Sequence, residues 1–248
     1  MDPETNTEEK QNRVELLWPG GPVFRQAAHA KLTTDTVLLA DFVSLRGVKR
    51  GIDLGCASGA LMLLLLAKNE KLYMTGIELV PEAALLAEEN MRLNGWEERA
   101  EIRAGDLRDT RAAFPAGSFD LVAANPPYFR QNSGKLPPNS DRASARAETA
   151  CTLEDTVEAA AYLCKSGGKV CFVQRPERLS ELCVRMTQKK LEPKRLRFVC
   201  YQEGKKPSLV LLEGRKDGNP GLEIEPVMVL KNNDGTDSAE YKRIYHAE

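Results

Sequence analysis

The stretch RGIDLGCASGALMLLLLAK, residues 50–68, decides the fold. It starts with a short apolar run, turns through Gly55 and Gly59, and continues as a run of helix-forming residues. A short apolar run followed by glycine is typical of a buried strand, and the leucine-rich run after the turn favours a helix. A strand that leads directly into a helix is the repeating unit of parallel sheets that carry helices on their faces.

The same alternation continues along the chain. Two closing apolar runs, 196–202 and 208–214, are joined by only a short linker and therefore predict an antiparallel pair. The sequence thus predicts an α/β fold, doubly wound, with a mostly parallel seven-stranded sheet whose last strand is antiparallel. The other strands are expected at residues 50–54, 73–79, 100–106, 119–125 and 169–174, and helices at 60–68, 81–95, 153–168 and 176–190.

Ahead of this alternation the chain has a different character. Residues 1–13 are polar and acidic and predict a disordered tail. The Pro and Gly residues of WPGGPV indicate a turn or hairpin between Val14 and Val23. Thr33, Thr34 and Asp35 precede VLLADFV, which is typical of a capped helix start.

Composition limits the classes of protein to consider. Hydrophobic residues make up 42% and charged residues 29%, as in ordinary globular proteins. No apolar run approaches the roughly 20 residues that span a bilayer, and the N-terminus is no secretory signal, so we expect a cytoplasmic protein. The six cysteines form no CxxC pair and only two histidines occur, so we expect buried, reduced thiols and no metal site.

The ends of the predicted parallel strands carry polar residues, and ligands of such sheets bind there. The first strand runs into a G-x-x-x-G loop between Gly55 and Gly59, which differs from the G-x-G-x-x-G of dinucleotide enzymes. Glu78 ends the second strand, where an acidic side chain can accept hydrogen bonds from both ribose hydroxyls. Asp106 ends the third and can accept one from an adenine amino group. Each can also be a plain turn or cap residue, but the three together favour an adenosine ligand.

The fourth strand ends in Asn125-Pro126-Pro127-Tyr128. Proline fixes φ and removes the backbone donor, which leaves a rigid display of carbonyl acceptors. The Asn125 oxygen and the Pro126 carbonyl can together accept both hydrogens of a planar amino group, and Tyr128 offers a ring for stacking. The motif therefore suits an exocyclic amine on a flat ring, or a carboxamide.

Taken together, DLGCASG, Glu78, GD and NPPY resemble the class I S-adenosylmethionine-dependent methyltransferases that act on amino groups, with a Rossmann-like fold. TTDTVLLADFV, ARAE, RPERL and DGTDSAEYKRIY are further similar to the bacterial tRNA1(Val) adenine-37 N6-methyltransferase family. The family commonly has glycine at the position of Ala57. The resemblance implies three parts: the tail 1–13, a hairpin and helix at 14–49 that cover the cofactor site, and a catalytic domain at 50–248.

The resemblance also implies roles for residues. Asn125, Pro126, Pro127 and Tyr128 are expected to hold the target amine and to be the catalytic residues. Apart from the resemblance, Phe129, Arg142, Arg146 and Arg175 are candidates for substrate contacts, with Arg178 as a weaker one, and each arginine can equally be a solvated surface residue. S-adenosylmethionine is expected to lie against residues from the strand ends and the first helix: Thr34, Asp35, Asp53, Gly55, Cys56, Ala57, Gly59, Glu78, Leu79, Asp106 and Leu107.

Charge bears on the substrate. The net charge is −1, but the stretch from Lys165 to Lys216 holds fourteen Lys or Arg residues against five Asp or Glu. Such a stretch can attract a phosphate backbone, or it can be an ordinary solvated surface. We therefore expect N6-methylation of an adenine in RNA, most simply tRNA, by a monomer or weak dimer. A protein glutamine, a DNA adenine, or a non-catalytic nucleotide-binding module are the alternatives.

Overall fold

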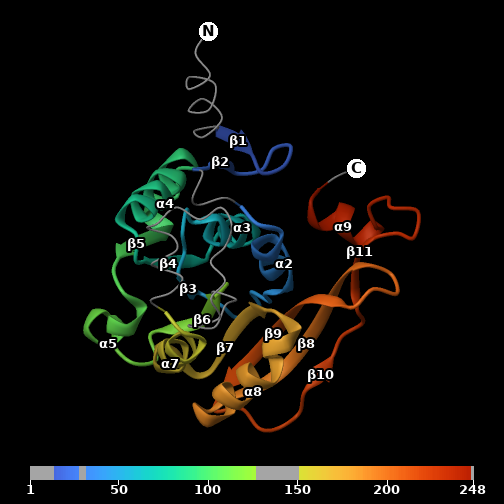
Figure 1. Ribbon diagram of the computed structural model, residues 1–248. Helices are drawn as coiled ribbons and strands as arrows, with labels where there is room; N and C mark the ends of the chain where they lie inside the picture. The colour runs from blue at the N-terminus through green and yellow to red at the C-terminus, as the bar shows by residue number, and fades with distance from the viewer. Residues whose placement is uncertain (1–13, 28–31, 127–150, 247–248) are drawn as a thin grey trace.

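The computed structural model of the chain describes residues 14–27, 32–126 and 151–246 (Figure 1). The predicted tail at 1–13 lies outside these ranges, as do residues 28–31, 127–150 and 247–248. Near the N-terminus, β1 (Val14–Leu16) and β2 (Val23–Arg25) form the predicted hairpin, with antiparallel pairing. No helix in the described residues is long and apolar enough to cross a membrane.

One sheet organises the rest of the described chain. The predicted strands appear as β3 (Arg50–Leu54), β4 (Tyr73–Glu78), β5 (Ala100–Ala104), β6 (Phe119–Ala124), β7 (Cys164–Gln174), β8 (Leu191–Gln202) and β9 (Pro207–Lys216). Their order across the sheet is β8-β9-β7-β6-β3-β4-β5, and β9 is antiparallel to both of its neighbours while the others run parallel. The predicted fold class is therefore confirmed. Two short strands that the sequence did not predict, β10 (Glu223–Ile224) and β11 (Met228–Lys231), pair with β8.

Helices cover both faces of this sheet (Figure 1). The first face carries α2 (Thr34–Phe42), α3 (Ala60–Lys68) and α4 (Pro81–Leu93), whose apolar side chains form one core cluster. The second face carries α5 (Thr110–Ala113), α7 (Leu153–Leu163) and α8 (Leu179–Gln188), with a second core cluster. Short 3-10 turns η1 (Glu97–Arg99), η2 (Leu107–Asp109) and η3 (Pro176–Arg178) link these elements, and α9 (Ala239–Ile244) ends the described chain.

The predicted helix at 153–168 is shorter than expected. It starts with a capping box between Thr152 and Asp155, but it ends at Leu163, before the two glycines. Cys164 already has extended geometry and pairs with Phe119 of β6, and the register shifts before Lys169 pairs with Leu121. The strand pairing therefore takes the chain out of the helix, and the glycines lie in an irregular part of β7.

The strand order places the glycine loop and the Asn-Pro motif side by side. β3 is paired with β4 on one side and with β6 on the other, so the chain direction across the sheet reverses at β3. Clefts form at such reversal points because the following helices leave on opposite faces, and ligands of doubly wound sheets bind there.

Candidate active site

The strand register aligns three residues from different strand ends. Leu54 pairs with Ile77, so Gly55 lies opposite Glu78. Asp53 pairs with Ala123, so Gly55 also lies opposite Asn125, two residues further along both strands. Neighbouring strands lie about 4.8 Å apart, so the three form a row across the carboxyl edge of the sheet. By strand alternation the side chains of Glu78 and Asn125 belong to the face that α2 and α3 cover. The sequence predicted all three as site residues.

The glycine loop is held by the neighbouring strand. The backbone N–H groups of Gly55 and Cys56 both donate to the Ile77 carbonyl, at 2.9 and 3.0 Å. Gly55 and Gly59 both have φ of +79°, which favours glycine. A Cβ at Gly55 would meet no atom within 4 Å, so this part of the loop borders open space. The loop thus offers backbone, not side chains, to a ligand.

Ala57 occupies an uncommon backbone conformation for a residue with a side chain. Its φ is +46°, in the left-handed region that glycine adopts without strain. The Ala57 N–H donates to Glu78 Oε2 at 2.9 Å, which holds the loop in this shape with alanine at this position. Cys56 is buried, and its sulfur lies toward Gly76 and Met62 and away from the loop surface.

Glu78 is fixed by two backbone donors. Its Oε2 accepts from Ala57 and its Oε1 accepts from the Val80 N–H at 2.8 Å. A carboxylate oxygen has two lone pairs, so both oxygens retain capacity for further hydrogen bonds such as those of ribose hydroxyls. Leu79, the next predicted residue, is a partly exposed apolar side chain at the same edge.

Asp53 lies two residues below Gly55 on the same sheet face and is 2% exposed. Burial raises the pKa of Asp53 to about 8, and the charge of Glu78 adds to the rise. A carboxyl group in this position is stabilised in its charged form by a cation. S-adenosylmethionine carries an ammonium group and a sulfonium, so the Asp53 carboxyl group beside an open glycine loop fits the positive part of that cofactor.

Asp106 and Leu107 follow β5 at the same edge. Asp106 caps η2 and forms an ion pair with Arg108, whose guanidinium lowers the pKa of the Asp106 carboxyl despite partial burial. Leu107 is half-buried against the second core cluster. The Asp106 carboxylate is therefore already engaged by Arg108, a partner that the sequence analysis did not foresee.

Asn125 and Pro126 lie at the end of β6, and Pro126 is buried. The Asn125 Nδ2 donates to Thr36 Oγ1 of α2 at 3.3 Å, a contact that spans 89 residues of sequence. The first turn of α2 thus lies against the motif. Five predicted residues lie outside the described residues: Pro127, Tyr128, Phe129, Arg142 and Arg146.

Helix α2 also carries the predicted residues Thr34 and Asp35. The Thr34 side chain lies beside that of Tyr245, which follows α9. Thr33 is the N-cap and accepts from the Thr36 N–H at 3.3 Å. The structure therefore brings Thr36 to the motif, and Thr34 to the C-terminal segment.

Asn90 is a site-supporting residue that the sequence analysis missed. It lies on α4, is fully buried, and donates to the Ser58 carbonyl of the glycine loop at 2.9 Å. It also exchanges two hydrogen bonds with the backbone of Arg25 in β2, at 2.7 and 3.0 Å. The only signal in the sequence is Asn90 and Asn94 on one face of a helix, four residues apart.

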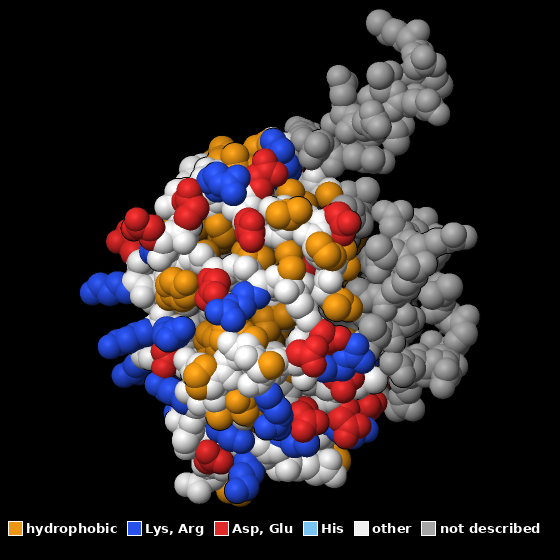
Figure 2. Space-filling model, turned by 90° about the vertical axis from the view of Figure 1, so that its left-hand side faces the viewer, with side chains coloured by type: hydrophobic (Ala, Val, Ile, Leu, Met, Phe, Trp, Pro, Cys, Tyr) orange, Lys and Arg blue, Asp and Glu red, His pale blue; other side chains and the backbone are white. Residues whose placement is uncertain are grey.

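Most of the basic residues between Lys165 and Lys216 have partners. Acidic residues from outside that stretch form ion pairs with five of them: Lys165 with Asp120, Arg185 with Glu154, Lys189 with Glu158, Arg195 with Glu225, and Arg197 with Glu240. Figure 2 shows the resulting mixture of basic and acidic side chains on the lower part of one face. Arg178 is buried and paired with Glu181, which suits a structural role. Arg175 is exposed at the end of β7 and donates to the Ser208 carbonyl.

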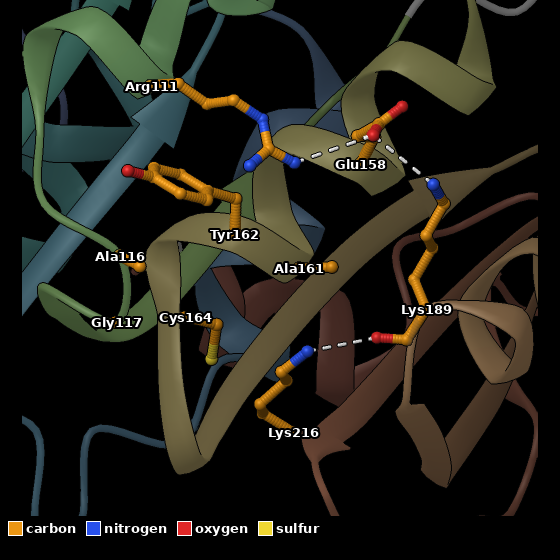
Figure 3. Close-up of a pocket in the computed structure, with 9 residues that line it drawn as sticks. All are labelled: Arg111, Ala116, Gly117, Glu158, Ala161, Tyr162, Cys164, Lys189 and Lys216. Carbon is orange, nitrogen blue, oxygen red and sulfur yellow. Dashed lines mark hydrogen bonds and ion pairs between the residues drawn. The ribbon is translucent and has the colours of Figure 1, made fainter.

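A pocket of about 460 Å³ lies at the opposite edge of the sheet (Figure 3). Its lining includes Gly117 just before β6, Cys164 at the start of β7, and Lys216 at the end of the antiparallel β9. Arg111 and Lys189 both lie close to Glu158 there. These positions belong to the amino ends of the parallel strands, and the pocket contains none of the predicted site residues. Among the described residues, no cluster of His, Cys, Asp and Glu can hold a metal ion.

Comparisons with known proteins show the family of the chain. The methyltransferase small domain family matches residues 23–188. A tRNA1(Val) (adenine(37)-N6)-methyltransferase of Tolumonas auensis is 32% identical over 85% of this chain and 86% of its own length. One of Escherichia coli O157:H7 is 32% identical over 73% of this chain and 74% of its own.

Solved structures share the fold. A "predicted O-methyltransferase" of Agrobacterium tumefaciens has a TM-score of 0.70 at 20% identity, covering 86% of this chain and 96% of that one. A geranyl diphosphate methyltransferase in complex with SAM has a TM-score of 0.52 at 14% identity, covering 73% of this chain and 84% of that one. From the family match and the relatives together, the chain belongs to the methyltransferase small domain family and, within it, to the group of the tRNA1(Val) (adenine(37)-N6)-methyltransferases.

Proposed function

We propose that this enzyme methylates the N6 amino group of an adenine in tRNA, equivalent to adenine 37 of tRNA1(Val), with S-adenosylmethionine as methyl donor. The row formed by Glu78, Gly55 and Asn125 carries the proposal, because it sets an amine acceptor beside a nucleoside site. The names of the relatives point to tRNA and to this adenine. A tRNA substrate supports a cytoplasmic location for the reaction.

The cofactor supplies an electrophilic methyl group on a positively charged sulfur. Asp53, Gly55 and Gly59 are placed to surround its amino-acid part, with Cys56 and Ala57 contributing backbone. Glu78 and Leu79 flank the position of the ribose, and Asp106 and Leu107 that of the adenine. Residues 14–49, the hairpin and α2, would cover this site. The hydrogen bonds from Asn90 to the hairpin and to the loop support that arrangement.

Asn125 and Pro126 prepare the substrate nitrogen. The lone pair of an adenine amino group is delocalised into the ring, which makes the nitrogen a poor nucleophile. When the Asn125 oxygen and the Pro126 carbonyl accept its two hydrogens, they favour the pyramidal nitrogen, whose lone pair is available to attack. The same oxygens stabilise the positive charge that develops on the nitrogen. The surplus proton then leaves to solvent, so no general base is required.

The target base must leave any stack to reach these acceptors, which favours an unpaired loop of RNA or a flipped base. Pro127 and Tyr128 continue the motif, and Tyr128 retains its predicted stacking role. Phe129, Arg142, Arg146 and Arg175 keep their predicted roles as substrate contacts. Arg175 is the one of these four that lies within the described residues, and its place at the carboxyl end of β7 agrees with that role.

A second feature favours RNA. β8 runs parallel to β7, so the β8–β9 turn rises at the same edge as Asn125. Gln174 at the end of β7 is level with Phe198, and β8 continues four residues further, about 13 Å. This turn carries the exposed Lys205 and Lys206, and Tyr201 beside it is 60% exposed. Among the described residues neither lysine has an acidic partner, so both can contact phosphates.

The experiment combines purified enzyme and labelled S-adenosylmethionine with tRNA that lacks the modification, with DNA, and with candidate proteins. Nucleoside mass spectrometry of the tRNA should then show N6-methyladenosine at one position. Label in protein alone would mean that a glutamine carboxamide is the substrate, and label in DNA alone would mean a DNA adenine. Cofactor binding without any transfer would favour a non-catalytic module.

The substitution Asn125→Ala tests the catalytic role that is proposed for Asn125. Loss of one fixed acceptor is expected to lower kcat by about 100-fold to 1,000-fold, as for other preorganised polar groups. Cofactor affinity, measured by calorimetry, should change little, since Asn125 acts on the incoming amine. A collapse of cofactor affinity in this variant would contradict the division of roles between the two halves of the site.

A further inference from the structure

Thr36 contacts the catalytic asparagine from a distant part of the chain. Its Oγ1 accepts a hydrogen bond from Asn125 Nδ2 at 3.3 Å. Thr34 and Asp35 in the same turn of helix were predicted as site residues, whereas Thr36 was not. A carboxamide has a donor end and an acceptor end, and this contact engages the donor end.

Thr33 completes a short chain of polar groups. Its Oγ1 lies 3.0 Å from Thr36 Oγ1 and also accepts from the Thr36 N–H as the cap of α2. When the Thr36 hydroxyl donates to Thr33, its lone pairs face Asn125. A hydroxyl can donate one hydrogen bond and accept two, so both contacts are made at once.

The helix that carries Thr36 is fixed at both ends. Near its start, the Thr34 side chain lies beside that of Tyr245. In its last turns, both Asp41 oxygens accept from Arg243 of α9, at 3.0 and 2.9 Å. Between these points Val37, Leu38 and Leu39 are buried in the first core cluster. Thr36 is therefore presented to Asn125 by a rigid element.

We propose that Thr36 is a positioning residue for the methyl transfer, which holds the Asn125 carboxamide with its nitrogen toward α2 and its oxygen toward the substrate amine. The inference rests on the proposed function in that it needs an amine as the acceptor. Rotation of the carboxamide by half a turn would direct its own N–H groups at the amine hydrogens, and the repulsion between them would oppose the reactive pose. Thr36 excludes that rotamer by engaging the nitrogen.

Thr36→Val tests the inference, because valine keeps the shape of threonine and removes the acceptor. We expect kcat to fall at least tenfold, while the KM values for S-adenosylmethionine and tRNA stay within about twofold. Thr36→Ser keeps the hydroxyl and should restore most of kcat. If Thr36 had a purely structural role, its substitution would instead lower the melting temperature. In that case Thr36→Ser and Thr36→Val would not differ in kcat alone. Unchanged kcat in Thr36→Val would overturn the proposal.

A measurement without turnover separates this inference from the proposed function. The side-chain NH2 resonances of Asn125 can be assigned in a ¹⁵N spectrum as the pair that is lost in Asn125→Ala. In the wild type these protons should exchange slowly, and in Thr36→Val at least tenfold faster. If the exchange rates are equal, the Thr36 contact does not hold the carboxamide, whatever substrate the enzyme uses. If they differ and no tRNA is methylated, the proposed substrate is wrong and the positioning role stands.

Discussion

Asp53 holds its proton over an unusual pH range. Burial, together with the charge of Glu78, raises its pKa from 3.8 to about 8 in the ligand-free fold. Between these two pH values the folded protein retains a proton that the unfolded chain has released. The contribution of Asp53 to the free energy of unfolding must therefore fall as the pH rises from about 4 to about 8.

The substitution Asp53→Asn removes this loss of stability at higher pH. In urea unfolding of ligand-free protein, the stability of the variant relative to wild type should increase by roughly 2–4 kcal/mol between pH 5 and pH 8.5, since each pKa unit corresponds to about 1.4 kcal/mol. Asp41 provides the opposite control, because hydrogen bonding and the charges of Arg243 and Lys68 outweigh burial and lower its pKa. Asp41→Asn should lose stability at pH 7, and that loss should shrink only below pH 4. A pH-independent difference for Asp53→Asn would refute the assignment.

Gly55 and Gly59 have the same φ and different surroundings. Alanine at either position costs about 1–2 kcal/mol of left-handed strain. At Gly59 its Cβ would also lie 2.9 Å from Met91 Cε and 3.2 Å from Ala87 Cβ, whereas at Gly55 it would point into open space. Gly59→Ala should therefore lose about 1–3 kcal/mol more stability in a urea titration. Gly55→Ala should lose more affinity for S-adenosylmethionine in calorimetry, and the reverse ranking would place the cofactor elsewhere.

At the scale of secondary-structure elements, α4 joins the N-terminal hairpin to the glycine loop. Asn90 and Asn94 each exchange two hydrogen bonds with the backbone of β2, at Arg25 and Val23, in the manner of a neighbouring strand. Asn90 adds the hydrogen bond to the Ser58 carbonyl. Both asparagines therefore hold β2 in place, and only Asn90 also holds the glycine loop.

This difference gives a matched pair of variants. Asn90→Ala and Asn94→Ala should each lower the free energy of unfolding by about 2–3 kcal/mol, because backbone groups of β2 lose their partners. Only Asn90→Ala should weaken S-adenosylmethionine binding, by several-fold, since the glycine loop then loses a support. Equal cofactor affinity of the two variants in calorimetry would show that the Ser58 contact does not shape the loop.

These elements also show what could be predicted from the sequence. The strands and α3 follow from apolar runs and glycine punctuation, which are local signals, so β3 and α3 fall within the predicted ranges. The end of α7 could not be predicted, because pairing of Cys164 with Phe119 overrides the local preference. β10 and β11 are too short to leave a periodic pattern.

The candidate site divides in the same way. Gly55, Glu78 and Asn125 could be placed because each ends a parallel strand, and parallel strands bring their ends to one edge. The hydrogen bond of Thr36 to Asn125 and that of Asn90 to Ser58 depend on how helices pack on the sheet. Their hydroxyl and amide side chains fit equally well on a solvent-exposed helix face, so the sequence holds no signal for Thr36 and, for Asn90, only its spacing of four residues from Asn94.

At the scale of the whole molecule, the folded chain reorganises its charge. The basic excess between Lys165 and Lys216 is partly neutralised by acidic residues that fold against it, such as Glu154, Glu158 and Glu240. A linear charge count therefore overstates the field that an RNA meets. The exposed lysines of the β8–β9 turn, Lys205 and Lys206, have no acidic partner among the described residues. They lie at the edge of the sheet that also carries Asn125.

Replacing both of these lysines should weaken tRNA binding specifically. In Lys205→Ala/Lys206→Ala, the tRNA Kd should rise several-fold, and the slope of log Kd against log salt should fall by up to about 1.4, since each phosphate contact to a single strand contributes about 0.7. Lys190→Ala/Arg215→Ala removes the same charge from exposed positions at the opposite edge of the sheet and should leave the Kd unchanged. S-adenosylmethionine affinity should be unaffected in both. If the two double variants weaken tRNA binding equally, the effect comes from net charge and the β8–β9 turn is not a docking surface.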